Sequence, residues 1–394
     1  MTTAEPPKQE IAWCLGESEH YHCAAPTIEL RNVSIAYVHK AFAPPLLFKV
    51  QCDMLIRSAH GPTPGKTNHP IWLTRRAFIG CLLAAPFLPL WFSSCSEGDT
   101  AGGWVFDPHN PVLGGALGVC FDPFVLKQGD RYKMWFSWRT QHAIGYTESV
   151  NGYQWSAPRI VLMPDPAIAG QIEVNRTSVL VRDGRYHLWY TGQSAEHSQI
   201  YYATSFDGLA WIRSSAQPVL VPTLEWEKNA VMAPDVLWDD ERNEFRMYYS
   251  AGEQYEPDCI ALATSANGIA WTKREQPILI ADPRSRWEQA KVTGADVHNI
   301  EGWYYMFYIG FADVHHASIG IARSRDGISG WHKHPANPIL RAPGRLHLFA
   351  WNRDAIYKPS AIREEDKWTV FFNARRRDIE QIGMAVHQGV DLRF

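Results

Sequence analysis

Tyr132-Lys-Met-Trp-Phe-Ser137 is the first of five similar aromatic segments, and their recurrence decides the fold. Each segment follows a short apolar run and a turn, and each precedes a further strand-like run that ends in small residues. Aromatic and β-branched runs between turn residues are typical of strands. The other segments are Tyr186-His-Leu-Trp-Tyr-Thr191, Phe245-Arg-Met-Tyr-Tyr-Ser250, Tyr304-Tyr-Met-Phe-Tyr-Ile309 and Trp368-Thr-Val-Phe-Phe-Asn373.

A second motif follows the first four copies and ends in tryptophan. Its Asn-Gly or Asp-Gly pair between apolar strands is a strong hairpin signal. The motifs are Ser149-Val-Asn-Gly-Tyr-Gln-Trp155, Ser205-Phe-Asp-Gly-Leu-Ala-Trp211, Ser265-Ala-Asn-Gly-Ile-Ala-Trp271 and Ser324-Arg-Asp-Gly-Ile-Ser-Gly-Trp331. Their tryptophans lie 56 to 60 residues apart, a period suited to propeller blades of about four strands. We expect each tryptophan to pack between neighbouring blades; the plainer alternative is turn chemistry alone.

The fifth copy lacks the tryptophan and the Pro-Ile-Leu-like run that follows it in the other copies. Trp104-Val-Phe106 and Asn110-Pro-Val-Leu113, upstream of the first copy, resemble the missing piece. The predicted fold is therefore an all-β, five-bladed β-propeller with four-stranded blades over residues 104–394. The amino-terminal strand of this domain is expected to complete the last blade and leave no sheet edge open.

The front of the chain differs in composition. Arg75-Arg76 precedes an apolar run from Ala77 to Phe92, and Ser93-Ser94-Cys95 follows, as in a twin-arginine export signal followed by a lipobox. We predict a disordered or mispredicted leader over residues 1–53 and an export signal over 54–95. The protein is expected to be periplasmic or extracellular, with a lipid anchor on Cys95 as an option. The alternative is an internal apolar segment packed on the propeller.

Composition excludes several functional classes. The net charge is −3 with no basic stripe, so a nucleic-acid partner has little support. Only Cys120 and Cys259 follow Cys95, too few for a disulfide framework. No cofactor and no metal site is predicted, because the adjacent His315 and His316 would point to opposite faces of a strand.

Inner strands of a propeller line its axial channel, so polar residues that begin these strands should meet at one mouth. They are Asp122, Asn175, Arg176, Asp235, Asp296 and Lys358, with Glu173 nearby. Carboxylates, basic groups and aromatic rings around one pit suit a carbohydrate, because glycosidic cleavage needs an acid and a base. The structural alternative is that these residues cap turns or neutralise one another.

The chain resembles the five-bladed propeller glycosidases of glycoside hydrolase family 43 and the related family 32. Asn110-Pro-Val-Leu-Gly114 followed by Phe121-Asp122-Pro123 is similar to the first-blade motif of family 43, which implies that Asp122 is the catalytic base. The family's pKa-modulating Asp and its acidic Glu have no direct match. Ala233-Pro234-Asp235 and Thr293-Gly294-Ala295 stand at those places. Asp235 or Asp296 is predicted to act as the acid or the modulator, and Glu173, Glu227 and Glu288 are less favoured acids.

Three functions follow from these patterns. The first is an exported glycoside hydrolase acting on polysaccharides or oligosaccharides, with Asp122, Asp235 and Asp296 as catalytic residues. Asn175, Arg176, Lys358 and Glu173 would bind the substrate. The second is a non-catalytic carbohydrate-binding propeller. The third is a glycoside phosphorylase, with Arg375-Arg376-Arg377 binding phosphate.

Overall fold

The computed structural model describes residues 28–31, 53–56, 99–168, 171–344, 347 and 350–394. The chain divides into two compact units, Met1–Leu90 and Trp91–Phe394. In the first unit, β1 (Ile28–Arg31) and β2 (Asp53–Ile56) pair antiparallel. The rest of the predicted leader and export signal lies outside the described residues, as do Arg75, Arg76 and Cys95, so both stay predictions.

The described part of the second unit consists of strands and three short 3-10 turns, which confirms the predicted all-β class. The turns are η1 (Gly115–Leu117), η2 (Arg139–Gln141) and η3 (Glu225–Glu227). The first two groups of strands, each antiparallel, are β5 (Cys120–Gln128), β6 (Arg131–Trp138), β7 (Ala143–Ser149) and β8 (Arg159–Leu162), then β9 (Glu173–Arg182), β10 (Arg185–Gln193), β11 (Ser198–Ser205) and β12 (Ile212–Arg213). The aromatic segments of the sequence lie on the second strand of each group.

The later strands repeat this antiparallel order. They are β13 (Ala230–Asp239), β14 (Glu244–Gly252), β15 (Cys259–Ser265), β16 (Thr272–Lys273) and β17 (Leu279–Ile280); then β18 (Lys291–Ile300), β19 (Trp303–Asp313), β20 (His316–Ser324), β21 (His332–Lys333) and β22 (Leu340–Arg341); and last β23 (Ala355–Arg363), β24 (Lys367–Arg376) and β25 (Ile379–Gln388). A parallel bridge from Ser198 to Ala230 joins the second and third groups into one sheet.

Two early strands pair with late ones. β3 (Asp99–Thr100) pairs antiparallel with β22, and β4 (Trp104–Phe106) pairs antiparallel with β25. Trp104 lies opposite His387 and is buried against Phe307. The segment upstream of the first aromatic copy therefore pairs with the last strand of the chain.

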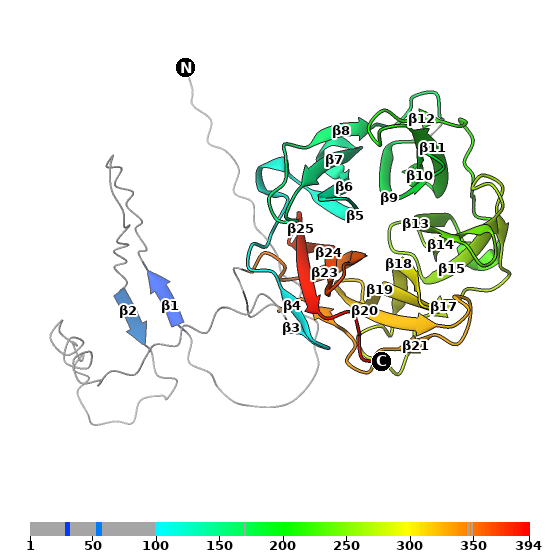
Figure 1. The fold of residues 1–394 in the computed structure, drawn as a ribbon. Helices are drawn as coiled ribbons and strands as arrows, with labels where there is room; N and C mark the ends of the chain where they lie inside the picture. Colours follow the sequence, from blue (N-terminus) through cyan, green and yellow to red (C-terminus); the bar gives the residue numbers. More distant parts are fainter. Residues whose placement is uncertain (1–27, 32–52, 57–98, 169–170, 345–346, 348–349) are drawn as a thin grey trace, which may run out of the picture. The chain divides into compact units, whose positions relative to one another are not determined.

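The sheets stand around a common centre, with the first strand of each group nearest to it (Figure 1). These first strands contact one another in a cycle, from β5 to β9, β13, β18, β23 and back to β5. The hydrophobic core lies between neighbouring sheets. One cluster, for example, joins Trp135 of β6 to Leu188 and Tyr190 of β10. Residues far apart in sequence consequently meet where the first strands approach the centre.

The tryptophan motifs hold neighbouring sheets together, as expected. Trp211 lies edge-on against Trp135 of the preceding sheet, with ring centroids 6.5 Å apart, and Trp271 lies 6.2 Å from Trp189. The glycine of each motif also accepts a hydrogen bond: Trp135 Nε1 donates to the carbonyl of Gly208 at 2.9 Å. The motif is thus both a turn and an inter-sheet contact.

Candidate active site

A bulge interrupts the first strand of each group near its start. The pairing register shifts there in all five first strands. We count the last paired residue before the shift as the first residue of the bulge. The second residue then has a positive φ in every case, between 36° and 62°. These residues are Asp122, Arg176, Ala233, Gly294 and Lys358, and all five line one pocket. A β-bulge re-aims a side chain, and here it turns one repeat position toward the centre.

The strained backbone at these positions is held by the preceding sheet. The backbone N–H of Arg176 donates to Ser137 Oγ at 2.9 Å, and that of Ala233 to Thr191 Oγ1 at 3.0 Å. In the same way the N–H of Asp122 donates to Asn373 Oδ1 at 3.1 Å. These acceptors are the last residues of the aromatic segments, so the repeat itself fixes the pocket residues.

The expectation that Asp235 and Asp296 face this pocket needs correction. Asp235 Oδ2 accepts the backbone N–H of Val297 at 2.8 Å, and Asp296 Oδ2 accepts that of Ala361 at 2.9 Å. Both carboxylates are buried and absent from the pocket lining.

Serines make the same bond elsewhere in the repeat. Ser178 Oγ accepts the N–H of Val236, and Ser360 Oγ accepts that of Val125, both at 2.9 Å. The carboxylates therefore occupy a position that links each first strand to the next one.

These two aspartates also form a buried electrostatic group with His298. His298 Nε2 lies 2.9 Å from Asp296 Oδ2. Burial alone would lower the pKa of His298, but the charge of Asp296, the hydrogen bond to it and the charge of Asp235 together outweigh burial and raise that pKa. Burial and the charge of Asp296 raise the pKa of Asp235.

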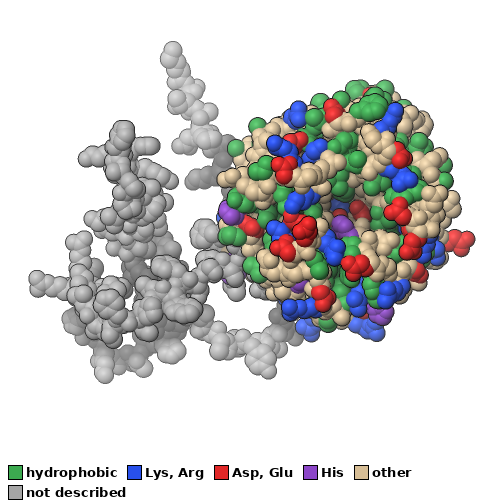
Figure 2. Space-filling view, in the orientation of Figure 1, with side chains coloured by type: hydrophobic (Ala, Val, Ile, Leu, Met, Phe, Trp, Pro, Cys, Tyr) green, Lys and Arg blue, Asp and Glu red, His purple; other side chains and the backbone are tan. Residues whose placement is uncertain are grey.

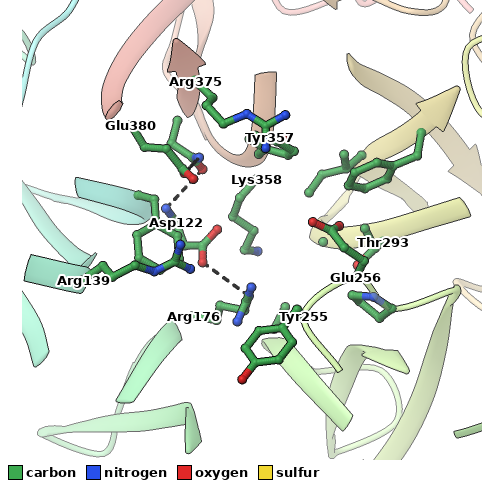
Figure 3. A pocket seen from close by; sticks show the side chains of 17 residues that line it. Asp122, Arg139, Arg176, Tyr255, Glu256, Thr293, Tyr357, Lys358, Arg375 and Glu380 are labelled. Carbon is green, nitrogen blue, oxygen red and sulfur yellow. Dashed lines mark hydrogen bonds and ion pairs between the residues drawn. The ribbon is translucent and has the colours of Figure 1, made fainter. Parts of the chain in front are cut away.

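The pocket encloses about 190 Å³ and is lined by three carboxylates and four basic side chains. The carboxylates are Asp122, Glu256 and Glu380, and the basic residues are Arg139, Arg176, Lys358 and Arg375. The molecular face in Figure 2 is hollowed near its centre, where basic and acidic side chains gather. In the close view, Asp122 and Glu256 lie on opposite sides of the pocket with Lys358 between them (Figure 3).

Asp122 is the deepest of the three carboxylates, with only 6% of its surface exposed. Its Oδ2 lies 3.4 Å from Arg176 Nε. Burial raises the pKa of Asp122, while Arg176, Lys358 and Arg139 act against that rise. A buried carboxylate beside cations can accept a proton or attack a carbon, as a glycosidase base or nucleophile does.

Sequence reasoning missed Glu256 and Glu380. Glu380 lies on β25 opposite Arg375, and its Oε2 accepts a hydrogen bond from Asn373 Nδ2 at 2.7 Å. Burial raises the pKa of Glu380 to about 7. Burial also raises the pKa of Glu256, which lies in the connection between β14 and β15. The three arginines at 375–377 marked the segment before Glu380 as a candidate for binding a charged ligand. Glu256, in contrast, stands in a connection without a repeat pattern.

Of the predicted substrate-binding residues, Arg176 and Lys358 line the pocket but Asn175 and Glu173 do not. Asn175 is buried; its Nδ2 donates to Gln193 Oε1 at 2.6 Å, and its Oδ1 accepts from Arg176 Nη1 at 3.2 Å. Glu173 lies 3.3 Å from His142 Nδ1. Asn175 therefore positions the Arg176 guanidinium rather than facing the cavity.

Glu227 and Glu288, the less favoured acids, have structural partners. Lys273 Nζ lies 2.6 Å from Glu227, and Tyr249 donates a hydroxyl to the same carboxylate at 2.8 Å. Lys333 and Tyr308 bind Glu288 in the same way, at 2.7 and 2.9 Å. Neither glutamate lines the pocket.

Within the described residues, no group of three or more His, Cys, Asp or Glu side chains is arranged to hold a metal ion. A helix long and apolar enough to cross a membrane is likewise missing from the described part of the chain.

Comparison with known proteins agrees with the predicted resemblance. A model of the glycosyl hydrolases family 32 N-terminal domain matches residues 124–311. A thermostable family-43 glycoside hydrolase is 18% identical with a TM-score of 0.55, over 71% of this chain and 91% of that one. A glycosyl hydrolase from Bacteroides ovatus is 14% identical with a TM-score of 0.58, over 73% and 94%.

Two uncharacterized proteins of Mycobacterium tuberculosis are 28% identical over 155 residues, which is 37% of this chain and 50% of each relative. The chain thus spans about half the length of the curated relatives it matches. At these identities the solved structures establish the fold alone. With the family match over residues 124–311, the chain is similar to the glycoside hydrolases of families 32 and 43.

Proposed function

We propose that the protein is a glycoside hydrolase that cleaves O-glycosidic bonds in the axial pocket. The observation that carries the proposal is the pair Asp122 and Glu256, two carboxyl groups on opposite sides of one enclosed, cation-lined pocket. Hydrolysis of a glycoside needs one carboxylate as base or nucleophile and one carboxylic acid to protonate the leaving oxygen.

Each carboxyl suits one of these roles. Asp122 lies beside Arg176, whose charge partly offsets the rise in pKa that burial causes and so stabilises the ionised form that a base needs. Glu256 has a pKa raised by burial, which favours the protonated form that an acid needs. Glu380 also has a raised pKa, but its carboxylate accepts a hydrogen bond from the side chain of Asn373. The same Asn373 side chain accepts the backbone N–H of Asp122. We assign Glu380 to positioning Asp122 through Asn373.

The test compares leaving groups in three purified variants. Asp122→Asn should lose turnover on every substrate. Glu256→Gln should lose turnover on oligosaccharides but retain much of it on nitrophenyl glycosides, whose leaving group needs no proton. Glu380→Gln should slow both substrate classes alike. The acid assignment would be reversed by two results together. Glu256→Gln would lose turnover equally on both substrate classes, and Glu380→Gln would retain turnover on nitrophenyl glycosides alone.

A non-catalytic carbohydrate-binding protein is the second candidate, and one observation favours it. Ala233 and Thr293 line the pocket at the places where the resemblance implies an Asp and a Glu. A pocket without these groups can still bind sugar through its basic and aromatic side chains. Oligosaccharide binding by a wild-type protein that releases no reducing ends over days would select this candidate.

The architecture that supports the pocket is proposed as a five-bladed propeller closed by β4. The cyclic contacts of the first strands and the pairing of β4 with β25 support this arrangement. Closure would remove the open edge of β25, which is otherwise a template for association.

We also propose export through the segment 54–95, on the pattern of Arg75-Arg76 and the following apolar run. A chain starting at Met54 should reach the periplasm of a bacterial host. The double change Arg75→Lys and Arg76→Lys should stop it, and labelling with a radioactive fatty acid tests the anchor on Cys95. Unchanged secretion of the double variant would argue against the twin-arginine route.

A further inference from the structure

The pocket contains more basic than acidic side chains, four against three. Of the four, only Arg176 lies within ion-pair distance of a pocket carboxylate, 3.4 Å from Asp122. Lys358 Nζ donates to the carbonyl of Ala295 at 2.9 Å, and Arg375 Nη2 to that of His315 at 3.2 Å. Arg139 stacks 4.3 Å above the ring of Phe121. Among the described residues, no carboxylate forms an ion pair with Lys358, Arg139 or Arg375.

The nearby carboxyl groups neutralise these cations poorly. Burial raises the pKa of Glu256, and that of Glu380 to about 7, which favours the uncharged form of both carboxyl groups. Outside the pocket lining, Asp296 is paired with His298, and burial raises the pKa of Asp235. The positive charge of Lys358, which is only 2% exposed, acts on Asp122 and Asp235 but forms no ion pair with a described carboxylate.

A buried cation without an anion costs free energy, and binding an anion removes that cost. Guanidinium groups bind carboxylates and phosphates through paired hydrogen bonds. The hydroxyl of Tyr357, which is buried in the pocket lining and has no hydrogen-bond partner among the described residues, can add a further donor. The cavity thus offers an oxyanion several donors on different walls.

We infer that the axial pocket binds an oxyanion beside the scissile bond, either the carboxylate of an acidic sugar or an inorganic phosphate. The inference rests on the proposed glycosidase site and names its substrate class. With an acidic sugar, water adds to the anomeric carbon, Asp122 takes its proton, and the departing oxygen takes a proton from Glu256. With phosphate, a phosphate oxygen bonds to that carbon instead and the glycosidic bond breaks. The departing oxygen takes a proton from Glu256, which regains one from the hydrogen phosphate, so that a sugar phosphate and an alcohol are released.

Binding to the wild-type protein is the first test, measured by calorimetry at low and high salt. The probes are glucuronate, galacturonate and inorganic phosphate, each compared with glucose and galactose. At least one anion should bind about 10-fold or more tightly than the neutral sugars, and high salt should weaken it. Neutral sugars that bind as tightly as every anion would overturn the inference.

Variants locate the binding site. Arg375→Gln and Lys358→Gln should each weaken anion binding by about 10-fold, and each should weaken it more than the binding of neutral sugars. Arg376→Gln is the matched control, because Arg376 is the next residue on β24 and does not line the pocket. If Lys358→Gln fails to fold, Arg375→Gln still decides. Anion binding unchanged in Arg375→Gln and in any folded Lys358→Gln would overturn the assignment.

Turnover distinguishes the two sources of the anion. Hydrolysis of aryl uronides faster than aryl glycosides of neutral sugars supports an acidic substrate. Release of a sugar phosphate only when phosphate is present supports a phosphate co-substrate. Faster hydrolysis of neutral glycosides, without any effect of phosphate, contradicts both. If no glycoside is cleaved but the anion still binds, the proposed hydrolase fails while the oxyanion site stands.

Discussion

At the scale of single residues, one repeat position supplies the centre of the pocket. Asp122, Arg176 and Lys358 all occupy the second place of a bulge, and each has a positive φ. Asp235 and Asp296 occupy the fourth place, where each carboxylate accepts a backbone N–H from the first strand of the next group. The role of an inner-strand carboxylate therefore depends on its place within the bulge.

Asp235 tests this division of roles. Asp235→Ser should preserve an acceptor for Val297, because Ser178 makes the same bond from the same repeat position. Asp235→Ala leaves a buried N–H without a partner and should cost about 1–3 kcal/mol of the free energy of unfolding. Urea denaturation measures the cost. Turnover per folded molecule should survive in Asp235→Ser, and its loss in a stable variant would return this carboxylate to the catalytic set.

Glu380 should make the stability of the protein depend on pH. Its pKa is raised to about 7 in the folded state, so the folded protein holds this proton at pH values where the unfolded chain has released it. The free energy of unfolding should fall as the pH rises from about 4.5 to 7. Because Glu380 is half-buried, the effect is on the order of 1 kcal/mol. Glu380→Gln should flatten this dependence in urea melts at pH 5 and 8, and an unchanged slope would contradict it.

Part of this residue pattern could be predicted from the sequence. Asp122, Arg176 and Lys358 were predicted from their place at the start of the inner strands, and all three line the pocket. Asp235 was expected in the pocket, and it lies two residues after the pocket residue Ala233. Residues two apart on a regular strand share a face. The bulge breaks that alternation, and a bulge at a Pro-Asp or Gly-Ala step has no clear sequence signal.

At the scale of elements, the tryptophan motif connects each sheet to the one before it. Gly208 has a φ of +76°, and a Cβ there would lie 2.9 Å from Trp135. The carbonyl of the same glycine accepts the Trp135 indole N–H. The hairpin and the inter-sheet packing were both predicted from this motif, since turn residues and aromatic rings are local signals. That Glu256 lines the pocket could not be predicted, because the connection between β14 and β15 has no periodicity.

Gly208→Ala measures the inter-sheet part of this motif. Gly184 is the matched control, because its φ is +72° and a Cβ there would meet nothing within 4 Å. Both variants carry the backbone cost of a positive φ, about 1 kcal/mol. Gly208→Ala should cost about 1–3 kcal/mol more through the clash with Trp135. Equal melting temperatures for the two variants would show that this contact contributes nothing.

At the scale of the whole molecule, an early strand of the second unit pairs with the last strand of the chain. β4 pairs with β25, and the buried ring of Trp104 packs against Phe307 of a different sheet. The pairing was predictable because the fifth copy lacks the piece that residues 104–113 resemble. The sequence contained no comparable signal for the pairing of β3 with β22.

Removal of β4 should expose the edge of β25 and the core beneath Trp104. A chain starting at Asp107 should melt at a lower temperature than one starting at Asp99, and it should form larger species on gel filtration. A truncated chain that stays monomeric with an unchanged melting temperature would contradict the proposed closure.

The substrate complex tests the central claim, that the bulged positions of the first strands form a sugar-binding catalytic pocket. The measurement is a crystal structure of Asp122→Asn soaked with an oligosaccharide that the wild-type protein cleaves or binds. We predict a glycosidic oxygen between Asn at position 122 and Glu256, with Arg176 or Lys358 contacting the same sugar. A sugar bound on an outer strand, with the axial pocket holding only water, would contradict the account.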